Sequence, residues 1–396
     1  MADLIPPLLT EHLSRLARMR ETQPVWRDER TGIWHVYRYA DVVPVLTDAR
    51  HFGVAHAPVA AATAAAPPMP EAPRYPAIRS KLREALSAHM LAQMAPTIGE
   101  AAGALLHPLL PAGKVEVMGA LARPLAAAVL AELVGVPAAD RARLVATLEA
   151  PGAGPPGESD YPATSSAPHG PAAPAAAEVS AYFAYLVADR RPDAQGDLIS
   201  RLLAPGPAGE RLGRDEVVAA CWFLMTSGRT VLADMMGNAV LCLSESHPGD
   251  CSLLARLRHE PPPVYSTTEE ALRFLPPVWS AQRTVRAAVA LGGETLPVGA
   301  RVSTWIVAAN RDPQQFPRPD RFDMDRIPNR HLTFGDGGTF ACLGTGLARL
   351  VIRLTLALLA QRLSWIELTP EDGPEVAGLP DRCSLVRLPV MFAPRG

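Results

Sequence analysis

The sequence predicts a mainly α-helical chain with small β-sheets, an α+β fold class. Residues 215–245 and the stretch after Cys342 repeat apolar side chains at helical spacing, whereas strand-like alternation is confined to short runs. Apolar residues make up 48% of the 396 residues and charged residues 20%, so the chain can bury a sizeable core.

The N-terminal part of the chain combines short ordered segments with a loop. Residues 33–47 begin with strand-like alternation, and a helix-like segment then starts at Asp41, which is a plausible N-cap. Residues 53–76 are rich in Ala and Pro and predict a loop. Residues 77–93 and 114–149 show helical periodicity.

Residues 151–177 have an unusual composition, PGAGPPGESDYPATSSAPHGPAAPAAA. Such a segment buries little surface, which predicts a long loop or a linker. A linker would divide the chain into two domains, whereas an active-site lid would keep one. We favour the lid, and therefore a single domain over residues 1–396, because the motifs after this segment depend on those before it.

The C-terminal half adds more helices and the remaining strands. Helical stretches are expected at 178–204, 215–245 and 264–274. Residues 283–312 predict short strands joined by glycine turns, and residues 310–340 are irregular and rich in Pro, Arg and Asp. Short strand-like runs close the chain.

Charge and cysteine usage argue against several classes of protein. The net charge is −2, without the basic excess of a nucleic-acid-binding protein. The five cysteines are an odd number and form no C-x-x-C pair, which disfavours disulfides and zinc and favours a reducing cytoplasm.

No segment has the character of a signal peptide or a membrane span. The N-terminus lacks a basic region followed by an apolar core. Residues 117–136 come closest to a span, but Arg123, Pro124 and Glu132 interrupt them. We therefore expect a soluble, cytoplasmic protein with neither a membrane nor a nucleic-acid partner.

Cys342 is the strongest candidate for chemistry. It follows a glycine-rich turn in the segment HLTFGDGGTFACLGTGLAR, residues 331–349, and precedes an apolar helical stretch. At a helix N-terminus, unpaired N–H groups and the helix dipole favour the thiolate over the thiol. A thiolate in such a loop is a good axial ligand for iron. The alternative is a buried cysteine in an ordinary loop.

Four stretches, in this order along the chain, resemble the cytochrome P-450 family of haem-thiolate enzymes. They are residues 34–52, the E-x-x-R helix at Glu270–Arg273, the meander-like segment 310–326 and the cysteine loop 331–349, with a weaker match at 190–203. The resemblance implies the fold of that family, haem b as the cofactor and Cys342 as the ligand of its iron. It also implies that Glu270 and Arg273 form a buried network with an arginine of the meander, here Arg321, that holds the cysteine loop.

The resemblance further assigns partners to the haem propionates. Arg79 and Arg83 are four residues apart and share a helix face, Arg283 matches another propionate-binding position, and His331 is a looser candidate. The alternative is that Arg79 and Arg83 are surface arginines without a ligand. This alternative carries more weight for Arg79 than for Arg83.

The cysteine loop departs from the family pattern. Phe334 and Cys342 are eight residues apart instead of seven, with the extra residue around Gly337–Gly338. Phe340 stands where the family commonly has a propionate-binding His or Arg. Phe334, Phe340 and Gly344 complete the expected haem contacts, and glycine can absorb an extra residue in a loop.

The central helix departs further. The family pattern there is a small residue, Gly, any residue, an acid and Thr, and the acid and alcohol relay protons. Ser227, Gly228, Thr230 and Val231 match this stretch, with Thr230 at the acid position and Val231 at the alcohol position when Gly237–Asn238 sets the register. A one-residue bulge would restore Thr230 as the alcohol without restoring the acid. Thr226 and Ser227 could hold a water as a weaker substitute.

These residues predict a haem-thiolate oxidoreductase, a monooxygenase with an atypical active site, acting on a bulky, apolar secondary-metabolite intermediate. Four routes stay open for the missing relay: a proton from the substrate, peroxide, a substrate with its own leaving group, or loss of activity. Electrons would come from a ferredoxin and a ferredoxin reductase. The alternative is a catalytically degenerate partner that activates a glycosyltransferase, since some members of the superfamily do so.

Overall fold

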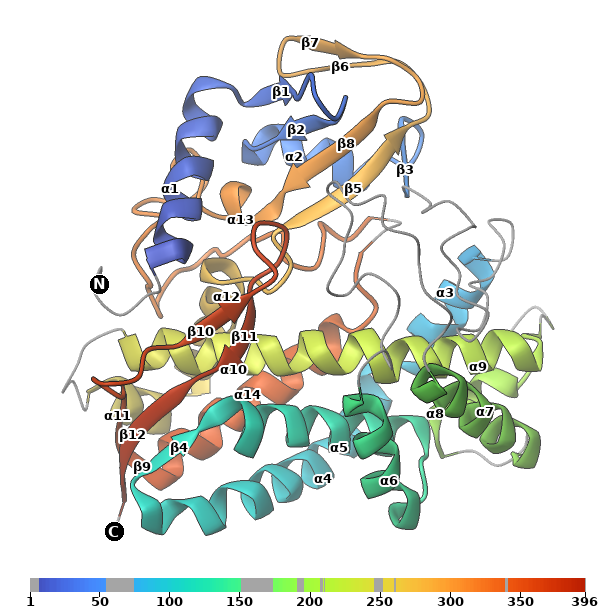
Figure 1. The fold of residues 1–396 in the computed structure, drawn as a ribbon, viewed down its shortest axis with the longest axis vertical. Coiled ribbons are helices and arrows are strands. Elements are labelled where there is room, and N and C mark those ends of the chain that lie inside the picture. The colour runs from blue at the N-terminus through green and yellow to red at the C-terminus, as the bar shows by residue number, and fades with distance from the viewer. Residues whose placement is uncertain are drawn as a thin grey trace. The chain divides into compact units, whose positions relative to one another are not determined.

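The computed structural model describes residues 7–54, 75–150, 174–190, 196–206, 209, 211–245, 252–259, 261–338 and 341–395. The chain divides into two compact units. Unit 1 consists of Met1–His56, Ala102–Ala122 and Asp234–Gly396, and unit 2 of Ala57–Ala101 and Arg123–Ala233. The helices of the described residues outweigh the strands, and the strands form small sheets, which confirms the predicted fold class (Figure 1).

Unit 1 contains every sheet of the described chain. Its elements are α1 (Pro7–Thr22), β1 (Val25–Arg27), β2 (Trp34–Val36), α2 (Tyr39–Thr47), β3 (Phe52–Val54), the 3-10 helix η2 (His107–Ala112), β4 (Lys114–Glu116), the π-helix η3 (Met118–Ala122), most of α10 (Arg229–Glu245), α11 (Ser252–His259), α12 (Pro261–Phe274), β5 (Ser280–Val285), β6 (Val289–Leu291), β7 (Glu294–Leu296), β8 (Arg301–Trp305), α13 (Ile306–Ala309), α14 (Thr345–Arg362), β9 (Leu363–Leu368), β10 (Glu375–Ala377), β11 (Ser384–Arg387) and β12 (Pro389–Pro394).

Unit 2 contains helices and connecting turns but no strand among its described residues. Its elements are α3 (Tyr75–Ala85), most of α4 (Ala88–Leu106), α5 (Arg123–Val134), α6 (Ala138–Glu149), α7 (Pro174–Asp189), α8 (Leu198–Leu203), α9 (Arg214–Phe223), the π-helix η4 (Leu224–Gly228) and the first turn of α10.

The largest sheet of unit 1 has the strand order β1-β2-β8-β5-β3, with β2 and β8 parallel and the other pairs antiparallel. Its buried side chains pack with those of α2 into one apolar core that includes Val36, Val42, Phe52 and Val302. Helices α1 and α13 lie beside this sheet (Figure 1), and Arg20 of α1 donates a buried hydrogen bond of 2.9 Å to the carbonyl of Ala308.

Three smaller sheets complete unit 1: β4-β12-β9, β10-β11 and β6-β7, all antiparallel. The strand-like runs expected near the C-terminus are β11 and β12. The expected helix over 215–245 consists of α9, η4 and α10 without a break, so a π-helical turn interrupts its α-helical spacing at 224–228.

Other expected helices are divided. The prediction over 114–149 begins with β4 instead of a helix, and α5 ends where Gly135 adopts φ +90°, a left-handed conformation that glycine favours. The N–H groups of Gly135 and Val136 both donate to the carbonyl of Ala131, at 3.1 and 2.8 Å, which closes the helix. Apolar periodicity continues across such a turn, so the pattern does not reveal it.

The predictions at 77–93 and 178–204 each cover two helices, α3 with α4 and α7 with α8. Asp197 caps α8, because its Oδ1 accepts the N–H of Ser200 at 2.8 Å. Residues 174–177, the end of the expected loop, already belong to α7; residues 151–173 and most of the loop at 53–76 lie outside the described residues. The single domain over 1–396 stays a prediction.

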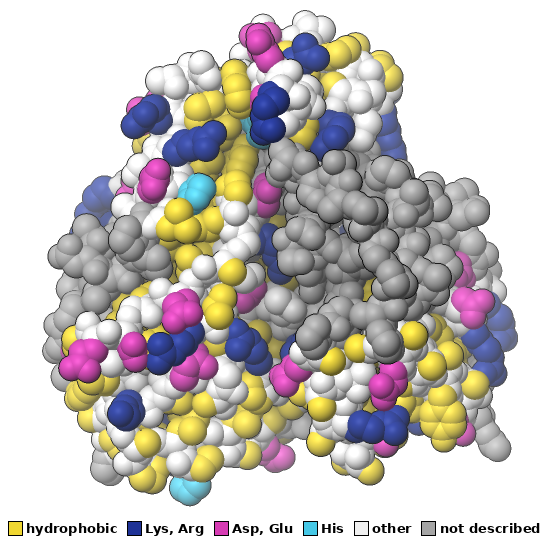
Figure 2. Space-filling model, viewed as in Figure 1, with side chains coloured by type: hydrophobic (Ala, Val, Ile, Leu, Met, Phe, Trp, Pro, Cys, Tyr) yellow, Lys and Arg dark blue, Asp and Glu magenta, His cyan; other side chains and the backbone are white. Residues whose placement is uncertain are grey.

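Two surface properties bear on possible partners. Among the described residues, no helix combines the length and apolarity needed to cross a bilayer. Figure 2 shows Lys and Arg side chains interspersed with Asp and Glu on the face in view, without a field of one sign.

Gly237 of α10 lies where neighbouring side chains leave no space for a Cβ atom. A Cβ there would lie 2.4 Å from Sδ of Met118 and 3.0 Å from Cδ1 of Leu385, both fully or almost fully buried. We expect Gly237→Ala to lower the free energy of unfolding by about 1–3 kcal/mol through overpacking. Gly103→Ala in α4, where nothing lies within 4 Å, is the control and should raise it by up to about 1 kcal/mol. Urea denaturation of both variants decides, and a stabilised Gly237→Ala would contradict the packing.

Candidate active site

Cys342 lies in a tight turn directly before α14. Its N–H donates to the carbonyl of Phe334 at 2.8 Å, and Gly335 between them has φ +78°. Gly344 is the N-cap of α14, and Thr345 Oγ1 donates to the carbonyl of Cys342 at 2.7 Å. The sulfur therefore precedes a helix N-terminus, as predicted. Cys342 is exposed, whereas the other cysteines of the described residues are buried.

Glycines make room around this turn. A Cβ on Gly344 would start 3.8 Å from the Cys342 sulfur, so a larger side chain there would crowd it. The extra residue of the loop falls where Gly337 has φ +69° and where a Cβ on Gly338 would lie 3.0 Å from Cα of Thr47 at the end of α2. The loop tip thus uses glycine to approach α2 closely. Phe340 and its predicted haem contact lie outside the described residues.

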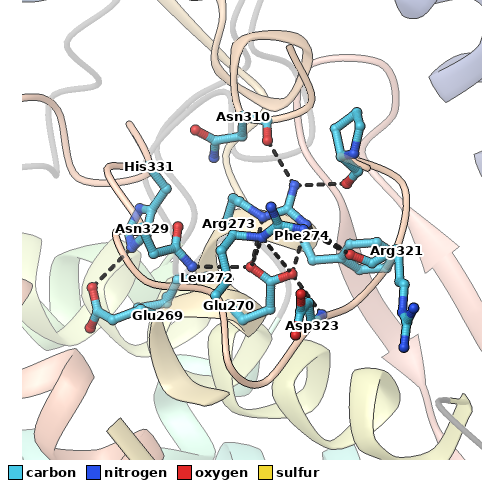
Figure 3. Close-up of polar contacts among 12 residues, drawn as sticks. Glu269, Glu270, Leu272, Arg273, Phe274, Asn310, Arg321, Asp323, Asn329 and His331 are labelled. Carbon is cyan, nitrogen blue, oxygen red and sulfur yellow. Dashed lines mark hydrogen bonds and ion pairs between the residues drawn. The ribbon is translucent and has the colours of Figure 1, made fainter. Parts of the chain in front are cut away.

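The E-x-x-R pair of α12 forms the centre of a buried network (Figure 3). The side chains of Glu270 and Arg273 have no exposed surface, and Arg273 donates to both carboxylate oxygens of Glu270, at 2.7 and 2.8 Å. Nη1 of Arg273 also donates to the carbonyls of Asn310 and Pro319, each at 2.8 Å. A bidentate, fully bonded pair of this kind is rigid and costly to break.

The prediction that Arg321 is the third member of this network is wrong, because Arg326 contributes the guanidinium. Nε of Arg326 lies 3.0 and 3.2 Å from the two carboxylate oxygens of Glu270. Arg321 instead offers its carbonyl, 3.3 Å from Nη2 of both Arg273 and Arg326. Because its backbone faces inward, its side chain is exposed and points away from Glu270 (Figure 3).

Asn310 connects the network to the cysteine turn. Its Oδ1 accepts the N–H of Leu332 at 2.7 Å, and its Nδ2 donates to Oγ1 of Thr333 at 3.0 Å. Thr333 in turn donates to the carbonyl of Leu272 on α12 at 2.7 Å. These bonds fix the strand of chain that enters the turn at Phe334.

His331 bonds to a protein carboxylate. Its Nε2 lies 3.2 Å from Oε2 of Glu269, which also receives a bidentate pair of hydrogen bonds from Arg349. Burial lowers the pKa of His331 below its ordinary value, although Glu269 opposes the shift. Burial would raise the pKa of Glu269, but the hydrogen bonds and charges of His331 and Arg349 lower it to about 2. The role of His331 as a partner of a haem propionate stays a prediction.

The predicted propionate-binding arginines lie in both units. Arg283 of β5, in unit 1, is half-buried and donates to the carbonyl of Gln282 at 2.8 Å. On α3, in unit 2, Arg79 is half-buried and Arg83 is exposed. The buried cation of that helix is Lys81, whose Nζ lies 2.5 Å from the carbonyl of Ala204. Convergence of the three arginines on one ligand stays a prediction.

The candidate relay residues lie at the π-helical turn and just after it. Ser227 and Gly228 belong to η4, and Thr230 and Val231 to the first turn of α10. Nearby hydroxyls bond back to their own helix: Oγ1 of Thr226 donates to the carbonyl of Trp222 at 2.8 Å, and that of Thr230 to Thr226 at 3.4 Å. π-Helical turns often accompany functional sites.

The course of α10 decides where a bulge could lie. α10 continues without interruption from Thr230 to Gly237, and the π-helical turn precedes Thr230. The bulge that would restore Thr230 as the alcohol is therefore absent between these residues.

Arg229 contacts the C-terminal end of α6. Its Nη2 donates to the carbonyl of Leu148 at 3.2 Å, and its Nη1 lies 3.9 Å from Oε1 of Glu149.

Sequence reasoning missed several polar residues. Arg349 and Glu269 are a bidentate pair, signalled only by the two consecutive glutamates of α12. Asp234 of α10 is 3% exposed and accepts a hydrogen bond of 2.8 Å from Oγ of Ser384. Burial, and secondarily the charge of Asp234, raises the pKa of the adjacent Cys383 thiol to about 12, so that Cys383 stays a thiol. The available signal was an aspartate in the middle of a helix whose neighbouring residues are mostly apolar.

The donor set fits haem. One exposed sulfur, in a glycine-lined turn at a helix N-terminus, suits an iron whose equatorial ligands come from a macrocycle. The same turn leaves no bulky side chain at Gly344 against the sulfur. In this fit the protein would contribute the sulfur of Cys342 and its orientation.

Comparison with known proteins agrees. The cytochrome P-450 family profile matches residues 262–389. The cyclomarin C epoxidase CymV of Salinispora arenicola is 33% identical over 92% of this chain and 93% of the relative, and the erythromycin C-12 hydroxylase of Saccharopolyspora erythraea is 32% identical over 93% and 92%.

Solved structures give the same answer for the fold. CYP109E1 of Bacillus megaterium, in complex with corticosterone, has a TM-score of 0.83 at 26% identity, over 96% of this chain and 99% of that one. The hydroxylase HmtN of himastatin biosynthesis has a TM-score of 0.78 at 28% identity, over 96% of both chains. The fold and the cysteine turn thus define a haem-dependent oxygenase class. The chain belongs to the cytochrome P-450 family.

Arg326 and Arg321 make a matched pair for testing the network. Replacing Arg326 with Gln leaves part of the buried charge of Glu270 uncompensated, so we expect a loss of about 3–5 kcal/mol in the free energy of unfolding. Arg321→Gln keeps the carbonyl that the network uses and should cost less than about 0.5 kcal/mol. Chemical denaturation measures both, and equal costs would show that the side chain of Arg321 also matters.

Proposed function

We propose that this protein is a haem-thiolate monooxygenase that tailors a bulky, apolar secondary-metabolite intermediate. The observation that carries the proposal is the Cys342 turn, held from Glu270 through Arg273, Asn310 and Leu332. The similarity to an epoxidase and a hydroxylase of natural products supports the substrate class.

The residues of the turn would hold haem b through Cys342. When bound, the haem supplies the iron chemistry of oxygen activation, which no side chain of the chain can provide. The protein orients the sulfur, because the N–H of Cys342 is bonded to Phe334 and its carbonyl to Thr345. Arg79, Arg83, Arg283 and His331 are the proposed partners of the propionates.

Proton delivery is the atypical part of the proposal. Val231, at the alcohol position, has no group that can relay a proton, and Thr230 stands where other members carry the acid. General acid delivery contributes about 10²–10⁴-fold where it operates. A hydroxyl or amine of the substrate, peroxide used in place of dioxygen, or a substrate with its own leaving group would replace it.

The partners follow from this chemistry. We propose a ferredoxin and a ferredoxin reductase as electron donors, in the cytoplasm. The Ala- and Pro-rich sequences of residues 53–76 and 151–177 favour an apolar substrate.

A second function is favoured by one observation, the missing acid and alcohol of the central helix. A member that has lost catalysis could serve as the activating partner of a glycosyltransferase. Against it stand the exposed Cys342 and the intact Glu270–Arg273 pair, which a scaffold would not need.

The carbon monoxide complex of the reduced protein tests the proposal. We expect a strongly red-shifted Soret band, because a thiolate ligand would donate electron density to the iron. Cys342→Ser should lose the band and turnover, with Cys383→Ser as a control that keeps both, since Cys383 is buried. A protein that stays colourless after reconstitution with haem would support the scaffold alternative.

Val231→Thr tests the missing alcohol. If the relay has been lost at this position, the variant should couple electron consumption to product formation better than the native enzyme when dioxygen and electron donors are supplied. Val240→Thr, further along α10 and 1% exposed, controls for adding a hydroxyl to the helix. Unchanged coupling in Val231→Thr would argue against a loss at residue 231, whereas turnover with peroxide alone would favour the peroxide route.

A further inference from the structure

A second ion pair lies beside the Glu270 network and joins different helices. Glu269 of α12 receives hydrogen bonds from Nε and Nη2 of Arg349 of α14, at 2.6 and 2.7 Å. The side chains are 27% and 34% exposed, so this pair is reached by solvent, unlike Glu270 and Arg273. Its geometry is the bidentate fork that arginine makes with carboxylates.

The guanidinium of Arg349 also covers an aromatic ring of the cysteine turn. Its Cζ lies 4.9 Å from the centroid of Phe334, within the range of a cation–π contact. Phe334 is 6% exposed, and its other ring neighbour is His331, with centroids 6.0 Å apart. His331 bonds to the same Glu269, so one carboxylate holds both of these groups that contact the ring.

Phe334 holds the backbone N–H of Cys342. Its carbonyl accepts the N–H of Cys342 at 2.8 Å. A continuous set of contacts therefore runs from Glu269 to Arg349, from Arg349 to the ring of Phe334, and from its carbonyl to Cys342. The Asn310 bonds fix the preceding Leu332 and Thr333, but they do not reach the Phe334 ring.

We propose that Arg349 is a positioning residue for Cys342. Glu269 holds its guanidinium over Phe334, the covered ring sets the direction of the Phe334 carbonyl, and that carbonyl sets the orientation of Cys342 and its sulfur. The role in metal binding rests on the proposed haem function, whereas the effect on the Cys342 thiol does not.

The pair differs from the Glu270 network in what it controls. Loss of a Glu270 partner leaves an uncompensated charge in the interior and weakens the whole fold. Loss of Arg349 leaves Glu269 partly in water, where solvent compensates its charge. We therefore expect Arg349 variants to remain folded while the cysteine turn loosens.

The first experiment uses the haem-free chain and follows modification of Cys342 by an aromatic disulfide, located by mass spectrometry. Arg349→Gln should react faster, by roughly five- to thirtyfold, if the turn opens more often. Arg349→Lys keeps the charge but not the fork, and should react at an intermediate rate. Glu269→Gln should resemble Arg349→Gln, which covers the case in which one variant fails to fold.

Arg387→Gln is the matched control, because Arg387 of β11 also pairs with carboxylates, Asp372 at 3.1 Å and Glu375 at 3.7 Å, on an exposed surface. It should leave the reactivity of Cys342 unchanged. Native reactivity in both Arg349→Gln and Glu269→Gln, or equal acceleration in Arg387→Gln, would overturn the proposal.

The second experiment measures the reduction potential and the carbon monoxide spectrum of the haem-loaded protein. Arg349→Gln should shift the potential and convert part of the thiolate band to that of a thiol complex, and Arg349→Lys should restore part of it. If the native protein lacks a thiolate band, the proposed function fails and the thiol reaction alone decides on Arg349. If the native band is present and identical in Arg349→Gln, the positioning role is wrong although the function holds.

Discussion

The carboxylate of Glu270 has no exposed surface, and the surrounding chain folds to satisfy it. Burying a carboxylate is unfavourable unless charges and hydrogen bonds replace the lost water. Arg273 and Arg326 supply the charges, and the N–H of Asp323 and Nδ2 of Asn329 add bonds of 2.8 and 3.0 Å. Asp323, Arg326 and Asn329 belong to an irregular segment without regular backbone hydrogen bonding. Their bonds to the Glu270 carboxylate stabilise the conformation of that segment instead. The shape of the segment that leads into the cysteine turn depends on this one charge.

Two consecutive glutamates of α12 serve the two sides of the turn. Successive helical residues point about 100° apart, so Glu270 faces the meander while Glu269 faces α14. Glu270 fixes the chain that enters the turn through Asn310, and Glu269 reaches the helix that leaves it through Arg349. The first is shielded from solvent and the second is partly exposed, so salt and solvent act more on the contacts of Glu269, which include His331 and Arg349, than on those of Glu270.

The sequence was sufficient for features that are local or periodic. The thiol before a helix, the spacing of Glu270 and Arg273, and the long helix at 215–245 all follow from neighbouring residues. It was insufficient where a contact depends on the path of an irregular chain. Nothing in the residues from 310 to 329 distinguishes Arg321 from Arg326, because no period says which side chain turns inward. Glu269 and Arg349 are 80 residues apart, and only the packing of α12 and α14 joins them.

The central helix could deliver protons poorly for two different reasons: its hydroxyls are bonded to carbonyls, or a hydroxyl is missing altogether. The hydroxyls of Thr226 and Thr230 are bonded to helix carbonyls, and releasing such a bond costs only about 1 kcal/mol. Those hydroxyls are therefore restrained but still able to exchange protons with a water. Val231 differs in kind, since no rotation of its side chain produces a donor. If Cys342 holds the haem as proposed, the valine at residue 231 favours chemistry in which the proton enters with the substrate or the oxidant. The specificity of the enzyme would then depend on the functional groups of its substrate as much as on the shape of its pocket.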